Sequence, residues 1–179
     1  MRYLADSAAV GPDLGREALR VTALADDGGL YPRYRQAYLE SKSEDQKSNI
    51  LSSIYFSDPD VIREHLDFSI SPAVPAGDAV VGIALYATLL DDQTVLYEWL
   101  AENLDAFLAK IPAYYHGLMP QMASGGCNRT TLAQMQDFFG SRGEQYALAL
   151  SRAKESIENC MNRREREREG LEQFLSQYR

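Results

Sequence analysis

Apolar side chains return every three or four residues along almost the whole chain, and this period restricts the fold more than any other feature. The segment 94–110 is typical, because its large apolar residues fall at helical steps: Leu96, Trp99, Leu100, Leu104, Phe107 and Leu108. Such spacing places them on one face of an α-helix. No convincing pair of strands interrupts the pattern, so the chain is predicted to be all-α.

The predicted helices begin at regular distances. Start signals occur near residues 12, 43, 75, 112 and 144, which gives intervals of 31, 32, 37 and 32 residues. Two helices fit into each interval, and this rhythm predicts an α-solenoid, a superhelix of HEAT-like antiparallel helix hairpins. The repeats share little sequence, so a plain helical bundle is the structural alternative. We expect one all-helical domain over residues 1–179.

Two polar motifs predict helix starts. Ser43 with Gln46 makes a capping-box pattern, and Ser57-Asp58-Pro59-Asp60 is a second start signal.

Local signals set several other boundaries. Residues 78–90 are apolar nearly all round, which predicts a helix enclosed on every side by its neighbours. Residues 124–128 read as a loop, and either Thr130 or Thr131 is expected to cap the helix that follows. The apolar positions of 146–161 and of 171–178 predict two separate helices at the end of the chain.

Charge and apolar content limit the partners. The 179 residues are 45% apolar, which suits a globular core, and their formal net charge is −8. Residues 1–110 carry 9 basic and 18 acidic side chains (9 − 18 = −9), whereas residues 111–179 carry 9 and 8 (9 − 8 = +1). Nucleic acid is bound by concentrated positive charge, so it is not expected as a partner. The longest apolar run, 79–90, is too short to span a membrane.

The residues that usually carry chemistry are sparse. His65 and His116 are the only histidines and lie far apart in the sequence, so no zinc-binding pair on one helix is possible. Cys127 and Cys160 lack the spacing of a zinc knuckle or a redox motif, and nothing marks the chain as oxidised. Both cysteines are therefore expected to be free and inert. The residues alone predict a helical scaffold with no catalytic group and no metal site.

Seven stretches, in collinear order, resemble the C-terminal helical domain of the aminopeptidase N family of zinc metallopeptidases, the endoplasmic-reticulum-aminopeptidase-like C-terminal domain. They are Val10-Gly11-Pro12-Asp13-Leu14, Lys47 with Leu51, Phe56-Ser57-Asp58-Pro59, Tyr97-Glu98-Trp99-Leu100 with Glu102-Asn103, Phe138-Phe139, Glu155-Ser156-Ile157-Glu158-Asn159, and Leu171-Glu172-Gln173-Phe174-Leu175. Cys160-Met161 stands where the family often has Trp-Leu, and Phe174 where a second Trp is common. These departures resemble bacterial members.

The resemblance implies a role within a larger enzyme. The zinc-binding motif of the family belongs to a preceding catalytic domain, so zinc is expected there and no cofactor is expected in this chain. The chain would be the distal part of the C-terminal domain, and its partners would be the catalytic domain of the same polypeptide and peptide substrates. It would enclose the active-site chamber and help to admit and select peptides. The loop expected to approach the substrate pockets is Ser124, Gly125, Gly126, Cys127 and Asn128. An ordinary interhelical turn is the alternative interpretation of this loop.

Two other functions are alternatives. The chain would be a stand-alone α-solenoid adaptor if it bound a protein partner on its concave face. It would be a hydrolase if Cys127 acted as a nucleophile beside His116, and then Cys127→Ala would abolish an activity. An isolated fragment is also expected to be able to form a homodimer through surface that its missing neighbours would cover.

Overall fold

The computed structural model describes residues 2–5 and 10–177. Within these residues the secondary structure is helical and no β-strand occurs, so the prediction of an all-α fold is confirmed. The α-helices are α1 (Arg2–Ala5), α2 (Pro12–Leu24), α3 (Tyr31–Glu40), α4 (Glu44–Leu51), α5 (Pro59–Ile70), α6 (Ala79–Leu89), α7 (Thr94–Lys110), α8 (Met119–Met122), α9 (Arg129–Gly140) and α10 (Ala147–Ser176); η2 (Ala113–Leu118) and η3 (Glu144–Tyr146) are 3₁₀ helices.

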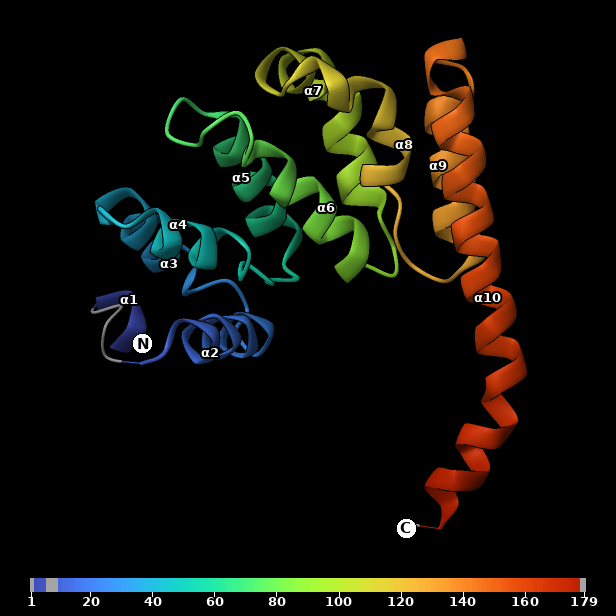
Figure 1. Cartoon of the computed structure of the whole chain (residues 1–179), viewed down its shortest axis with the longest axis horizontal. Helices are drawn as coiled ribbons and strands as arrows, with labels where there is room; N and C mark the ends of the chain where they lie inside the picture. Colours follow the sequence, from blue (N-terminus) through green and yellow to red (C-terminus); the bar gives the residue numbers. More distant parts are fainter. Residues whose placement is uncertain (1, 6–9, 178–179) are drawn as a thin grey trace.

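Each helix packs mainly on helices one or two places away along the chain. Helix α4 contacts α2 and α3, α5 contacts α6 and α7, α7 contacts α9, and α10 contacts α8 and α9. Figure 1 shows the result, a curved row of stacked helices that runs from α1 and α2 at one end to α9 and α10 at the other. This neighbour-to-neighbour packing is that of a solenoid. The predicted superhelix is therefore confirmed.

The predicted helix starts agree with the structure at two caps and differ at one. The Oγ of Ser43 accepts a hydrogen bond from the backbone nitrogen of Gln46 at 3.3 Å, and the carboxylate of Asp58 caps α5. Asn128 caps α9, so the expectation of Thr130 or Thr131 was wrong. The side-chain oxygen of Asn can cap a helix as that of Thr does. Asn128 lies two positions before Thr130, and it is the cap because α9 begins at Arg129.

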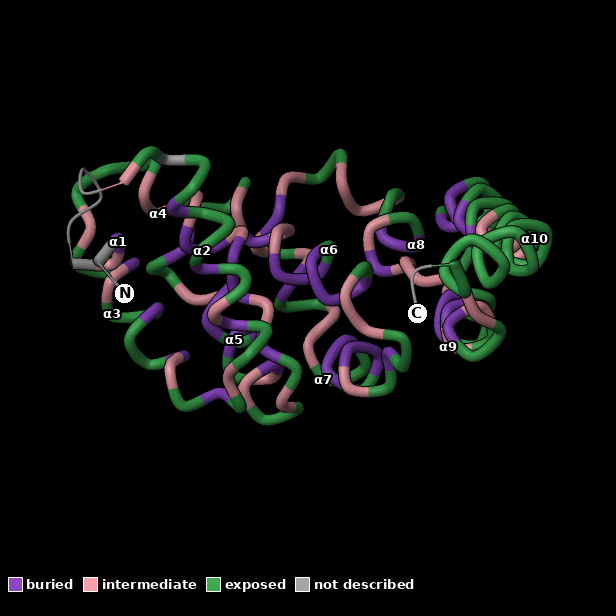
Figure 2. The backbone as a smooth tube through the Cα atoms, turned by 90° about the horizontal axis from the view of Figure 1, so that it is seen from below, coloured by how far each residue is buried: buried purple, intermediate pink, exposed green. Residues whose placement is uncertain are grey.

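Aromatic side chains fill the first half of the core. Tyr31, Tyr34 and Tyr38 project from α3 at helical spacing and are almost fully buried. The rings of Tyr34 and Phe56 meet edge to face with their centroids 5.3 Å apart, a favourable arrangement of the ring quadrupoles. Figure 2 shows many buried residues along the central helices α5, α6 and α7.

Helix α6 is enclosed on most of its surface, but not on every side as predicted. Ala79, Ile83 and Tyr86 are fully buried, whereas Ala84 and Thr88 remain exposed on one side. Apolar residues surround this helix because α5, α7 and α8 all pack against it. None of the helices in the described ranges is long and apolar enough to cross a membrane.

The end of the chain differs from the prediction, because one helix replaces the expected two. Helix α10 is 30 residues long and unbroken. Residues 162–169 contain mostly Arg and Glu, which are good helix formers, and the single Gly170 costs only about 1 kcal/mol. Ala149, Ala153 and Ile157 are its buried residues. Residues 162–177, here called the C-terminal extension, are exposed and project beyond the stack (Figure 1).

Candidate functional site

The loop of residues 124–128 joins α8 to α9 and is pressed against the end of α6. A Cβ atom added to Gly125 would overlap the carbonyl oxygen of Ala87, so only glycine fits at this position. Gly126 has a φ of 85°, a conformation that side chains with a Cβ rarely adopt. The two glycines therefore bring the chain close to α6 and turn it toward α9.

Two buried polar side chains bind the backbone of the loop and of the residue before it. The Nε2 of Gln93 donates to the carbonyl oxygens of Ala87 and Gly125, which joins α6 to the loop. The hydroxyl of Tyr97 donates to the carbonyl oxygen of Ala123 at 2.7 Å, and burial raises the pKa of Tyr97. Gln93 could not be recognised from the sequence, because a single Gln between two helices forms no characteristic pattern.

Asn128 links the loop to two further elements. Its Oδ1 accepts a hydrogen bond from the backbone nitrogen of Thr131 at 2.9 Å and so caps α9. Its Nδ2 donates to the carbonyl oxygen of Asp91 at 2.8 Å, in the turn that follows α6. One side chain thus fixes the start of α9 relative to the end of α6. All five residues of the loop are half-buried, so the loop packs against the body of the protein instead of extending into solvent.

A polar cluster beside Asn128 joins the start of α7 to α9. The carboxylate of Asp92 accepts hydrogen bonds from the hydroxyl of Thr94 at 2.6 Å and from the Nε2 of Gln134 at 2.9 Å. These bonds lower the pKa of Asp92 because they stabilise its charged form, and the bond from Thr94 has the largest effect. Asp92 therefore accepts hydrogen bonds at the start of α7 and also contacts α9.

Cys127 forms a disulfide with Cys160, and the expectation of two free cysteines was wrong. The two residues lie 33 positions apart, but their Cα atoms are only 5.3 Å apart. The hairpin of α9 and α10 brings them together, because α10 runs back along α9 to the loop. A sulfur in a disulfide is not a thiolate nucleophile. The hypothesis of a Cys127 hydrolase is therefore contradicted, and His116 instead lies 3.4 Å from the carbonyl oxygen of Ile111.

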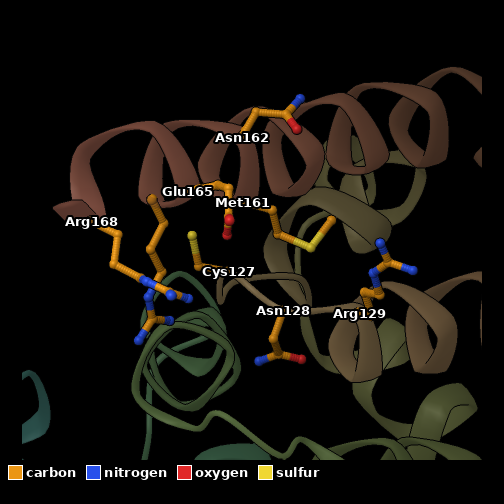
Figure 3. A pocket seen from close by; sticks show the side chains of 8 residues that line it. Cys127, Asn128, Arg129, Met161, Asn162, Glu165 and Arg168 are labelled. Atoms are coloured by element: carbon orange, nitrogen blue, oxygen red, sulfur yellow. The ribbon is translucent and has the colours of Figure 1, made fainter.

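Two grooves open beside the disulfide. The first, of about 470 Å³, is lined by Cys127, Asn128, Arg129, Met161, Asn162, Arg164, Glu165 and Arg168. Figure 3 shows that Glu165 and Arg168 reach from α10 to the side on which Cys127 lies, whereas Asn162 points away. The second, of about 570 Å³, is lined by Ser156, Asn159, Cys160, Asn162, Arg163 and Arg166. Five arginines against one glutamate give the surroundings of the disulfide a positive charge.

The described residues do not fit a metal ion. No group of three His, Cys, Asp or Glu side chains comes together among them. His65 is fully buried between the rings of Tyr31 and Tyr86, with centroid distances of 5.9 and 5.8 Å, and burial lowers its pKa to about 3. Both cysteine sulfurs are already bonded to each other. No step of zinc-dependent hydrolysis can be assigned to these side chains.

Comparison with known proteins gives one family. The model of the ERAP1-like C-terminal domain matches residues 2–159. No curated protein and no solved structure matched the chain. The matched segment contains every helix from α1 to α9 and the buried half of α10, and it ends one residue before Cys160.

Proposed function

This chain belongs to the ERAP1-like C-terminal domain family of the M1 aminopeptidases, and from that premise we propose that it walls the peptide chamber of such an enzyme without performing the reaction. The resemblance found in the sequence is thereby confirmed at the level of the family. The family is one of zinc aminopeptidases, so a catalytic domain is the partner that membership implies. Removal of N-terminal residues from peptides would take place on that domain.

The observation that carries the proposal is the match over residues 2–159. Two structural features support it. The described residues hold no cluster that fits zinc, so this part of the enzyme would contribute shape rather than chemistry. The superhelix is a curved wall, a form suited to enclosing a chamber that admits extended peptides and keeps folded proteins out (Figure 1).

We further propose that the loop of residues 124–128 faces the chamber and contacts substrate. Support comes from its construction, because Gly125 and Asn128 hold it in one place relative to α6 and α9. A loop that selects among substrates has to be held in position before the substrate binds. Otherwise part of the binding free energy is used to order the loop. The groove beside the loop also offers side chains of both signs, Arg129 and Glu165, to a peptide.

The first experiment asks whether the chain acts alone. The purified protein is expected to hydrolyse no aminoacyl-anilide, with or without added zinc, because residues 2–5 and 10–177 bring no group of metal-binding side chains together. Zinc-dependent turnover by the purified chain would contradict the proposal. A stand-alone adaptor would also be inactive, so the chain is then mixed with the catalytic part of the same aminopeptidase. Binding in this mixture is expected, and its absence would favour the adaptor.

The second experiment tests the loop in the aminopeptidase that carries this domain. Ser124→Trp adds a bulky ring to the loop, and Ser141→Trp is the matched control at the turn after α9. We expect Ser124→Trp to raise the KM for long peptides several-fold while leaving the turnover of a short aminoacyl-anilide unchanged. Equal kinetics for both variants on long peptides would show that the loop is an ordinary interhelical turn.

A further inference from the structure

The disulfide lies where α10 leaves the body of the protein. Ile157 is the last buried residue of the helix, and the C-terminal extension, residues 162–177, is exposed along its whole length. Cys160 stands between the two parts and is bonded to the loop through Cys127. Among the described residues this bond is the last strong tether between the body and the extension.

The same disulfide is open to a reagent from solution. Cys127 and Cys160 are only half-buried, and each lines one of the two grooves described above. Arg129, Arg164 and Arg168 border the first groove together with Glu165, so three positive charges stand against one negative charge there. Positive charge near a cysteine stabilises its thiolate, which helps both the approach of an attacking thiolate and the departure of the cysteine sulfur.

We propose that Cys127–Cys160 is a site of thiol–disulfide exchange that controls whether the C-terminal extension is helical. The reductant is a dithiol. One of its thiolates attacks a cysteine sulfur, the S–S bond breaks, and its electron pair leaves on the other cysteine as a thiolate. The second thiolate of the reductant then displaces the first cysteine. The dithiol is oxidised to a disulfide, and Cys127 and Cys160 become two thiols after taking up protons.

The expected response is confined to α10. An exposed helical segment of about 15 residues is marginal in water, so the contacts at its base decide how far its end frays. Breaking the disulfide removes one of these contacts, so the extension frays toward Ile157. The loop itself stays in place, because Gly125 still fits against Ala87 and Asn128 still caps α9. This inference does not depend on the proposed aminopeptidase role.

Amide hydrogen exchange on the whole chain tests the proposal, with and without dithiothreitol and without denaturant. We expect backbone amides of residues 158–168 to exchange at least tenfold faster in the reduced protein, while those of residues 79–110 change less than twofold. The double variant Cys127→Ser/Cys160→Ser is the matched control. It should exchange like the reduced protein and should not respond to dithiothreitol.

Three results would overturn the proposal. A disulfide that resists dithiothreitol until the whole protein unfolds is not an exchange site. Equal exchange of residues 158–168 in both redox states would show that the bond does not anchor the extension. Equal acceleration of residues 158–168 and 79–110 would show a bond that stabilises the whole fold.

A second variant separates fraying of a helix from other changes in α10. Gly170 lies in the extension, and a Cβ added there meets no atom within 4 Å. Alanine favours a helix over glycine by about 1 kcal/mol, which corresponds to roughly fivefold in the local opening equilibrium. Gly170→Ala should therefore slow amide exchange in the reduced extension about fivefold. No slowing would contradict a helix–coil transition.

Discussion

The stack from α3 to α7 and helix α10 are held by different interactions. In the first region large side chains are removed from water on several sides, and Tyr34, Phe56 and Trp99 are almost fully buried. In the second region α10 buries three small or medium residues and then loses contact with the body. A covalent bond, Cys127–Cys160, stands where burial ends.

The difference shows that one row of helices is held by two kinds of interaction. An inner helix has neighbours on both sides and gains stability from apolar area removed from water, about 25 cal/mol per Å². Among the described residues, α10 packs on α8, α9 and η3 and buries only three of its own residues. Here the last helix is longer than the surface that supports it, and the disulfide fixes its direction at the edge of that surface.

The strongest test of this comparison is a large core deletion. Trp99 is 1% exposed, its Nε1 donates to the carboxylate of Asp67 at 2.7 Å, and its ring meets Phe107 edge to face. Trp99→Ala should lower the free energy of unfolding by about 4 kcal/mol, because it leaves a cavity and an unpaired acceptor. Urea unfolding followed by circular dichroism measures the loss. A loss below about 1 kcal/mol would mean that the stack is not held by burial.

A change of pH tests the same core through His65. Its folded-state pKa is lowered to about 3 by burial, whereas the unfolded chain binds the proton near pH 6.5. The stabilisation is therefore complete above about pH 6.5 and is lost as the pH falls toward 3. Between pH 6 and 4 the free energy of unfolding should fall by about 1.4 kcal/mol per pH unit. Urea titrations at several pH values measure this slope.

The control for that slope removes the titrating ring. His65→Leu keeps an apolar side chain among Tyr31 and Tyr86 but cannot bind a proton. Its stability should vary much less between pH 6 and 4. If the two slopes are the same, the acid sensitivity comes from carboxylates elsewhere and not from His65.

At the junction of the two regions, Gly125 provides a sharper comparison. Gly125→Ala would force a Cβ against the carbonyl oxygen of Ala87 and should cost about 2 kcal/mol. Gly140→Ala is the matched control, because a Cβ at this end of α9 meets nothing within 4 Å; it should be neutral or stabilise by about 0.5 kcal/mol. Thermal unfolding of both variants distinguishes them. Similar effects at the two glycines would contradict the close packing of the loop on α6.

The smallest effect is expected in the C-terminal extension. Leu171 and Leu175 are 56% and 49% exposed, so replacing both with alanine removes little buried area. The free energy of unfolding of the body should change by less than about 0.5 kcal/mol. Urea unfolding of Leu171→Ala/Leu175→Ala measures it. A loss above about 1 kcal/mol would show that the extension packs on the body and would remove the contrast between the two regions.

The sequence was sufficient for the parts of the fold that depend on local pattern. The helical period gave the all-α class, and Ser43 and Asp58 marked helix starts that the structure confirms. The cap of α9 was misplaced, since Asn128, Thr130 and Thr131 all have side chains that cap helices and only the position of the first turn chooses among them. The break expected before residue 171 was wrong, since no helix stop precedes it except Gly170.

The proposed site was only partly accessible to sequence reasoning. The loop of residues 124–128 was recognised from its glycines, and its contact with substrate remains a prediction. Its supports were not recognised, because Gln93 and Asp91 come from the turn after α6, more than 30 residues away. Such contacts depend on how α6 meets α9, which no local pattern records.

By itself, then, the amino-acid order determined the helices, their rhythm and the resemblance to one family, since each of these is written in residues close together along the chain. Tertiary structure decided three other features: the pairing of Cys127 with Cys160, the burial of His65 and the close packing of Gly125 on α6. The physical reason is the same in all three cases. Each depends on the distance between groups on different helices, and that distance is set only when the apolar faces of the stack come together.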